Sequence, residues 1–194
     1  MTSTTDRTVR YWTRYVAADG TWRDKRKLPP GEDLAAFRAG LGRPAGTVPA
    51  LWPYYTSPID DRLARQDKVS QELTAEHAAL ALYGLHQQSR PDPMHRPDIR
   101  LGQALRRLHE DDHNKGFTRE AVDRRVDAAA SATQVSAFLT HLRGLVSQLR
   151  TVGAPLDYDL LLKDIRDWQR PDTRQLARRR LGLAYYGWQP APKR

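Results

Sequence analysis

The sequence of 194 residues contains no cysteine and no long apolar run. The lack of cysteine excludes disulfide bonds and thiolate metal sites, and it agrees with a cytoplasmic protein. No segment approaches the roughly 18 consecutive apolar residues that a membrane-spanning helix requires. The first ten residues are polar and lack the apolar centre of a signal peptide. These absences predict a cytoplasmic protein that makes no contact with a membrane.

Lysine is scarce as well, because only six of the 32 basic residues are lysine and 26 are arginine. The formal net charge of +9 and the pI of about 10.1 indicate a polyanionic partner. Arginine suits bidentate contacts with phosphates and stacking on bases. Residues 1–98 carry a net charge of +2, and residues 99–194 carry +7. The positive field therefore belongs mainly to the C-terminal half.

Apolar residues recur with the period of an α-helix, and no segment alternates convincingly with the period of a strand. The pattern predicts an all-α protein of two small helical bundles packed into one elongated subunit. We place the N-terminal helical domain at residues 1–116 and the C-terminal basic helical bundle at residues 117–194. In the first domain, Thr74 is expected to cap a helix that ends near Gln88, and Asp98 is expected to cap the next helix.

Two consecutive helices between Thr118 and Arg150 are the centre of the prediction. Thr118 caps the first helix, and Gly153 ends the second. The second helix carries one apolar stripe with the spacing of a buried face: Val135, Phe138, Leu139, Leu142, Val146 and Leu149. Asp157 is expected to cap a further helix, and a last helix follows from Asp172. Arginines occupy the outer sides of these helices, which predicts a surface for phosphates.

Two loops deserve a functional interpretation. The segment of residues 89–98 contains three prolines and several basic residues, including His95, so it is a candidate contact loop. Trp52, Tyr54 and Tyr55 follow a glycine- and proline-rich stretch and are able to stack on bases. Aromatic residues after a loop more often attach the loop to the core, and we expect that here.

One catalytic motif is present, since His109-Glu110-Asp111-Asp112-His113 fits the H-E-x-x-H pattern of zinc hydrolases. That chemistry needs both histidines on one face of a continuing helix. The residues from Asp111 onward are typical of a helix end instead, and no third histidine follows at a suitable spacing. We therefore predict no catalytic residue, no metal and no cofactor, and keep a zinc hydrolase as the weaker alternative.

Several segments together resemble the CasB family, the small subunit of the type I-E CRISPR surveillance complex called Cascade. The resemblance runs from about Val9 to the end of the chain. It is carried by the early helix from Gly31, Ala79 to Gln88, Leu101-Gly102-Gln103-Ala104-Leu105, Val122-Asp123-Arg124-Arg125, Leu139 to Leu149, Pro155-Leu156-Asp157-Tyr158, Trp168 and Tyr185-Tyr186-Gly187. No single motif identifies the family, but the order of all these motifs along the chain is specific for it. Ala39 departs from the pattern, because the family often has a second arginine after the position of Arg38.

The resemblance implies a non-catalytic subunit that works inside a larger assembly. Its partners would be the backbone and large subunits, a second copy of itself, the hybrid of CRISPR RNA with target DNA, and the displaced single strand. The subunit would stabilise the R-loop by holding the displaced non-target strand without reading its sequence, in antiviral defence. Contacts with the nucleic-acid backbone suit that role, because R-loop formation is close to energetic balance.

The arginines on outward helical positions are the expected phosphate contacts. They are Arg38, Arg100, Arg107, Arg124, Arg125, Arg143, Arg150, Arg170 and Arg174. Of these, Arg124, Arg125 and Arg143 also match motifs of the family. About half of the set is expected to pair instead with acids such as Asp123 and Asp127. A sequence-specific helical DNA-binding regulator remains the alternative, and it would bind one duplex sequence tightly as a dimer.

Overall fold

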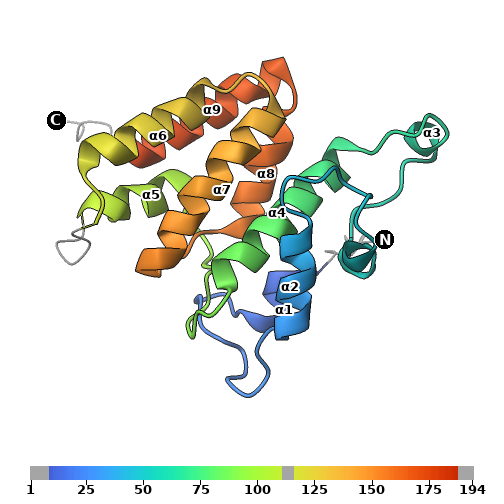
Figure 1. Cartoon of the computed structure of the whole chain (residues 1–194), viewed down its shortest axis with the longest axis horizontal. Coiled ribbons are helices and arrows are strands. Elements are labelled where there is room, and N and C mark those ends of the chain that lie inside the picture. Colours follow the sequence, from blue (N-terminus) through green and yellow to red (C-terminus); the bar gives the residue numbers. More distant parts are fainter. Residues whose placement is uncertain (1–8, 111–115, 188–194) are drawn as a thin grey trace, which may run out of the picture.

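The computed structural model describes residues 9–110 and 116–187, and this part of the chain is built from helices (Figure 1). They are α1 (Tyr11–Tyr15), α2 (Gly31–Ala39), the 3-10 helix η1 (Pro49–Tyr54), α3 (Asp61–Ala64), α4 (Gln71–Gln87), α5 (Leu101–Glu110), α6 (Arg119–Ser131), α7 (Val135–Val152), α8 (Tyr158–Trp168) and α9 (Pro171–Tyr186). The β-contacts of these residues are two isolated bridges. The all-α prediction is confirmed. None of the described helices is long and apolar enough to cross a membrane.

Helix α4 is the centre of the molecule, because α2, α7 and α8 all pack against it (Figure 1). Every residue from Ala75 to Gly84 is buried. A helix that is covered on all sides carries little directional apolar pattern, so its start is hard to find from periodicity. The predicted cap at Thr74 is wrong. The helix begins one turn earlier, where the Ser70 hydroxyl accepts a hydrogen bond from the Leu73 amide at 3.0 Å.

The C-terminal helices pack closely around one aromatic pair. The ring of Trp168 at the end of α8 stacks on Phe138 of α7, with 3.7 Å between centroids. The Trp168 indole N–H donates to the carbonyl of Ala132, which joins α6 to α7, at 3.0 Å. This contact fixes the ends of three helices to one another.

Helix α5 lies in the predicted N-terminal domain, yet it packs against α6, α7 and α9 of the predicted C-terminal bundle. Buried residues from both ranges form one continuous hydrophobic cluster. The division into residues 1–116 and 117–194 stays a prediction.

Three of the predicted helix ends are confirmed. The Thr118 hydroxyl accepts from the Ala121 amide at 3.3 Å, and the Asp157 carboxylate accepts from the first amides of α8. Gly153 ends α7 with a φ of +68°, a conformation that favours glycine. The cap predicted at Asp98 is wrong, because α5 begins only at Leu101.

The proline-rich segment of residues 89–98 is fastened to the chain before α8. The Leu156 amide donates to the Met94 carbonyl at 3.2 Å, and the Arg96 amide donates to the Leu156 carbonyl at 2.9 Å. Met94 and His95 are almost fully buried as a result. His95 therefore cannot contribute to a contact surface, whereas Arg96 is exposed, and a contact role for the loop stays a prediction.

Candidate nucleic-acid interface

Two adjacent arginines stand on the outer side of α6. Thr118 starts this helix, and Val122 and Val126 turn its apolar stripe towards the core. Arg124 and Arg125 are exposed on the other side. Among the residues that the structure describes, neither guanidinium has a hydrogen bond or an ion pair. Both are therefore available to an external anion.

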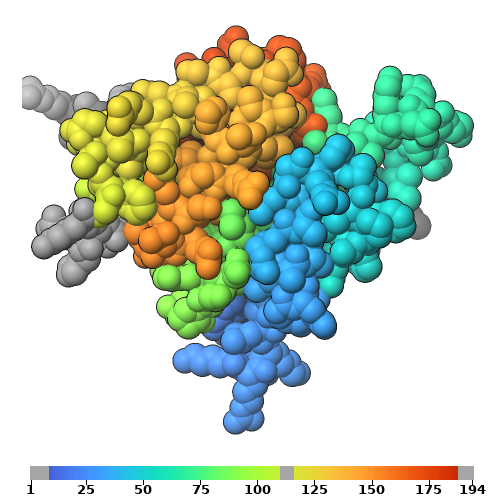
Figure 2. Space-filling view, viewed as in Figure 1, coloured from blue at the N-terminus to red at the C-terminus, as the bar shows by residue number. Residues whose placement is uncertain are grey.

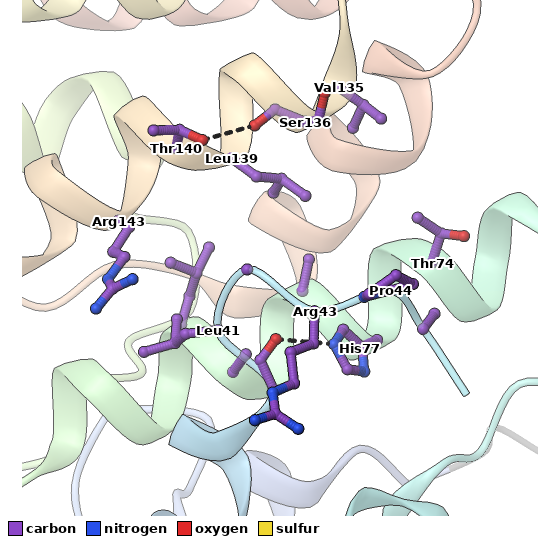
Figure 3. Close-up of a pocket in the computed structure, with 16 residues that line it drawn as sticks. Leu41, Arg43, Pro44, Thr74, His77, Val135, Ser136, Leu139, Thr140 and Arg143 are labelled. Atoms are coloured by element: carbon purple, nitrogen blue, oxygen red, sulfur yellow. Dashed lines mark hydrogen bonds between the residues drawn. The ribbon is translucent and has the colours of Figure 1, made fainter. Parts of the chain in front are cut away.

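The third arginine of the matched motifs, Arg143, is exposed on α7, and its guanidinium also has no hydrogen bond or ion pair within the described ranges. Arg143 lines an apolar cavity between α7 and the loop that follows α2, a cavity that Arg124 and Arg125 do not line (Figure 3). The sequence gives no sign of this neighbourhood, since the two sides of the cavity are about one hundred residues apart.

Three of the predicted phosphate contacts bond within the protein. The Nε of Arg150 donates to the carbonyl of Gln88 at 3.0 Å, and the Nε of Arg174 donates to the carbonyl of Trp168 at 3.0 Å. Arg170 pairs with Asp172 at 2.7 Å. The partners of these three arginines are therefore other groups than the expected Asp123 and Asp127.

A second group of arginines lines a hollow between α5 and α9. Arg100, Arg106 and Arg180 surround a space of about 360 Å³ together with Gln103 and Gly187. Arg100 belongs to the predicted set. The sequence interpretation missed Arg106 and Arg180, because they come together only through the packing of α5 against α9, which the local pattern of either helix does not contain.

Two carboxylates fix one arginine of this hollow. Arg180 reaches Asp164 at 2.7 Å and Asp167 at 2.6 Å. Burial raises the pKa of Asp164, although the hydrogen bond from Arg180 opposes it. Burial alone would also raise the pKa of Asp167, but Lys163 and Arg180 outweigh it and lower that pKa. The hollow is thus held rigidly on its α9 side.

The remaining predicted contacts do not line the hollow between α5 and α9. Arg107 is exposed on α5, and Arg38 is half-buried on α2. Of the three aromatic residues, Tyr54 donates its hydroxyl to Asp33 at 2.6 Å, and Tyr55 bonds to His77 at 2.8 Å. These two attach their loop to the core, as expected. Trp52 is 57% exposed and offers a ring face to solvent.

A metal or catalytic centre has little support in the described residues. His109 lies half-buried in α5 beside the Tyr185 ring, while Asp111, Asp112 and His113 of the H-E-x-x-H motif lie outside the described residues. One group of suitable ligand atoms does come together, from His95, Asp157 and Asp159.

Protein donors already occupy that group. The Tyr158 amide donates to the Nδ1 of His95 at 3.1 Å, and the Trp12 indole donates to Asp159 at 3.1 Å. Asp157 accepts from the amides that begin α8 and from the Asp98 amide. These hydrogen bonds give each residue a structural task, namely fastening residues 94–98 and Trp12 to the start of α8.

Comparison with known proteins links this fold to CRISPR systems. A family model described as CRISPR-associated protein Cse2 matches residues 33–186. The chain is similar to CasB from Thermobifida fusca, with 29% identity, coverage of 80% of this chain and 84% of that chain, and a TM-score of 0.62. It is also similar to CasB from Thermus thermophilus, with 26% identity, coverage of 81% and 86%, and a TM-score of 0.58.

A chain from a CRISPR RNA-guided surveillance complex has the same fold, with a TM-score of 0.59 at 21% identity and coverage of 82% and 83%. A search of curated proteins finds no match. The family model spans α2 to α9 almost completely, so it includes both arginine groups and the cavity beside α7. The resemblance to the CasB family is confirmed, and the chain belongs to the Cse2 family of CRISPR-associated proteins.

Proposed function

We propose that this chain is a non-catalytic subunit of a type I-E CRISPR RNA-guided surveillance complex. Within it, the chain binds the nucleic-acid backbone without sequence specificity and stabilises the R-loop by holding the displaced non-target strand. Its partners are the backbone and large subunits, a second copy, and the hybrid of CRISPR RNA with target DNA. Membership of the Cse2 family and the fold shared with a chain of such a complex support the assignment to this assembly.

The nucleic-acid part of the proposal depends on one observation, the exposed pair of Arg124 and Arg125 on α6 without internal partners. Guanidinium groups that touch phosphates release condensed counterions, which favours binding whatever the sequence. Because replacing the DNA duplex by the RNA–DNA hybrid is nearly balanced in energy, even a few such contacts shift the equilibrium towards the R-loop.

Reversing both charges is the direct test. In the assembled complex, Arg124→Glu combined with Arg125→Glu should weaken binding of labelled target DNA. The slope of log affinity against log salt should become shallower by about 1.4, which is roughly 0.7 for each lost single-strand contact. The matched control combines Arg62→Glu with Arg65→Glu. Arg62 is exposed on α3 and Arg65 directly after it, far from α6 (Figure 1), and the change in net charge is the same.

Equal losses in the two double variants would reduce the effect to net charge and overturn the assignment of Arg124 and Arg125. Arg143 is left out of the variant because it lies at the apolar cavity. Assembly is measured separately by mass photometry without DNA, so that a weaker R-loop is not confused with a missing subunit.

The isolated chain gives a second prediction. In chelator, fluorescence anisotropy on unrelated single-stranded and duplex DNA should show binding that ignores sequence. The log–log slope with salt should be about −2 to −5, as for a few phosphate contacts. Strong preference for one duplex would favour the sequence-specific regulator instead, and binding lost in chelator would favour a metal site.

A further inference from the structure

An apolar cavity of about 360 Å³ opens between α4, α7 and the loop of residues 40–45 (Figure 3). The loop and α7 form its two walls, and α4 lies between them. Figure 2 shows α7 and the α2 region next to each other on this face of the molecule. The cavity is separate from Arg124 and Arg125, which do not line it.

The cavity exists because the apolar stripe of α7 is wider than the surface that the core covers. Phe138 and Leu142 are fully buried, whereas Val135 and Leu139 from the same stripe are only half-buried and face the cavity. Opposite them, α4 presents the small side chain of Ala78. A wall of larger residues would have closed this space. Instead, hydrocarbon remains in contact with water, which another apolar group would displace favourably.

Three polar side chains in the walls are already satisfied inside the protein. The two ring nitrogens of His77 bond to the Tyr55 hydroxyl at 2.8 Å and to the Gly40 carbonyl at 3.0 Å. The hydroxyls of Thr74 and Thr140 donate to carbonyls of their own helices. A nucleobase entering the cavity would exchange hydrogen bonds with water for a wall with few free partners, while a hydrocarbon side chain would lose none.

The rim has the opposite character, because two arginines stand at the opening. Arg43 comes from the loop wall and Arg143 from α7 (Figure 3). Both side chains are exposed, and neither guanidinium group has a hydrogen bond or an ion pair within residues 9–110 and 116–187. An apolar hollow with two unpaired guanidinium groups is complementary to a large apolar side chain that has carboxylates beside it.

We propose that this cavity is a docking site for a protein segment of another subunit of the surveillance complex. The segment carries a leucine, methionine or aromatic side chain that fills the cavity, and aspartate or glutamate residues next to it pair with Arg43 and Arg143. That the segment comes from another subunit rests on the proposed function. The apolar and acidic character of the segment follows from the cavity itself.

Thr140→Trp tests the apolar part. Thr140 is exposed at the cavity wall, and its hydroxyl bonds, among the residues that the structure describes, to its own helix alone, so an indole there covers the opening without breaking a tertiary contact. Thr151→Trp is a matched control, because Thr151 is exposed on the same helix, has the same type of hydrogen bond to Ser147, and does not line the cavity.

The probe is the assembly of the other subunits on fluorescent CRISPR RNA, prepared without this chain and without DNA. Titration with the chain measures its incorporation. Thr140→Trp should weaken incorporation by about tenfold or more, as expected when a central anchor is excluded, and Thr151→Trp should leave it unchanged. Arg43→Glu should weaken it by about threefold at low salt and less at high salt, whereas Arg65→Glu, directly after α3, should not.

The other possible results distinguish a failure of the proposed function from a failure of the docking site. If the unchanged chain fails to incorporate, the proposed function fails. If the unchanged chain and Thr140→Trp incorporate equally, the proposed function stands and the docking site is overturned. Normal incorporation with weaker target DNA binding would assign the cavity to nucleic acid. A sedimentation change of the isolated chain in Thr140→Trp alone would assign it to a second copy, and either result also overturns the proposal.

Discussion

Replacing Gly102 by alanine should lower the free energy of unfolding by about 3 kcal/mol, the cost of overpacking against a rigid neighbour. Gly102 lies on α5 where it crosses α9. A Cβ atom there would be 2.5 Å from the carbonyl oxygen of Leu181 and 2.6 Å from the amide nitrogen of Tyr185. Both atoms are backbone, so no side-chain rotation relieves the clash. The two helices would have to separate.

Gly182→Ala is the matched control on α9. A Cβ atom at Gly182 would have no heavy atom within 4 Å. Alanine is the better helix former, so this variant should gain about 0.5–1 kcal/mol. Thermal unfolding measures both variants, and 3 kcal/mol corresponds to roughly 6–12 °C for a chain of this size. If Gly102→Ala behaves like Gly182→Ala, the close approach of α5 and α9 is not a constraint on the fold.

The contact between α5 and α9 explains why one of the motifs shared with the CasB family contains a glycine. In Leu101-Gly102-Gln103-Ala104-Leu105, the side chains of both leucines and the alanine are buried, and the glycine permits the approach of α9. Periodicity alone predicts the buried positions of such a helix, and it predicts the helix itself. It does not predict which other helix comes closest, because that information is not contained in the local pattern.

The helices whose ends are best predicted from the sequence have one buried face and a recognisable capping residue. Asp157 and Thr118 are examples, since each side chain accepts from the amides of the helix that follows. Helix α4 was predicted less well because it is buried all round. Its true cap, Ser70, lies before the apolar pattern begins.

An outward position on a helix does not by itself predict that an arginine side chain is free to bind an external anion. Arg150 and Arg174 have the same spacing as exposed arginines, but each reaches a carbonyl at the end of another helix, at Gln88 directly after α4 and at Trp168 of α8. Arg43 is available although it lies in a loop, where periodicity says nothing. Which arginines contact phosphate stays a prediction that the variants of α6 are designed to test.

The second large effect on stability is expected at a buried carboxylate that binds Arg10, near the start of the described chain. Glu76 of α4 is 2% exposed and pairs with Arg10 at 2.7 Å. It accepts hydrogen bonds from the amides of Thr56 and Ser57 at 2.9 and 2.8 Å, and from the Thr56 hydroxyl. One side chain thus joins three segments. Glu76→Gln should lower the free energy of unfolding at pH 7 by about 3 kcal/mol, because an amide nitrogen then faces donors in a buried place.

The pH dependence of that loss identifies its cause. Burial alone would raise the pKa of Glu76, but the hydrogen bonds from Thr56 and Ser57 outweigh it and hold the pKa below its ordinary value of 4.5. A carboxylate with a lowered pKa stabilises the folded state above its unfolded pKa, and this contribution is lost as the pH falls through the folded pKa. The stability difference between the unchanged chain and Glu76→Gln should therefore shrink steadily below about pH 4.5.

Urea unfolding between pH 7 and pH 3 measures this difference in the free energy of unfolding. The control variant is Glu72→Gln, because Glu72 is exposed and lies one turn earlier on α4. A difference that stays constant over this range would mean that Glu76 acts through packing and not through its charge, since every other titrating group is common to both proteins.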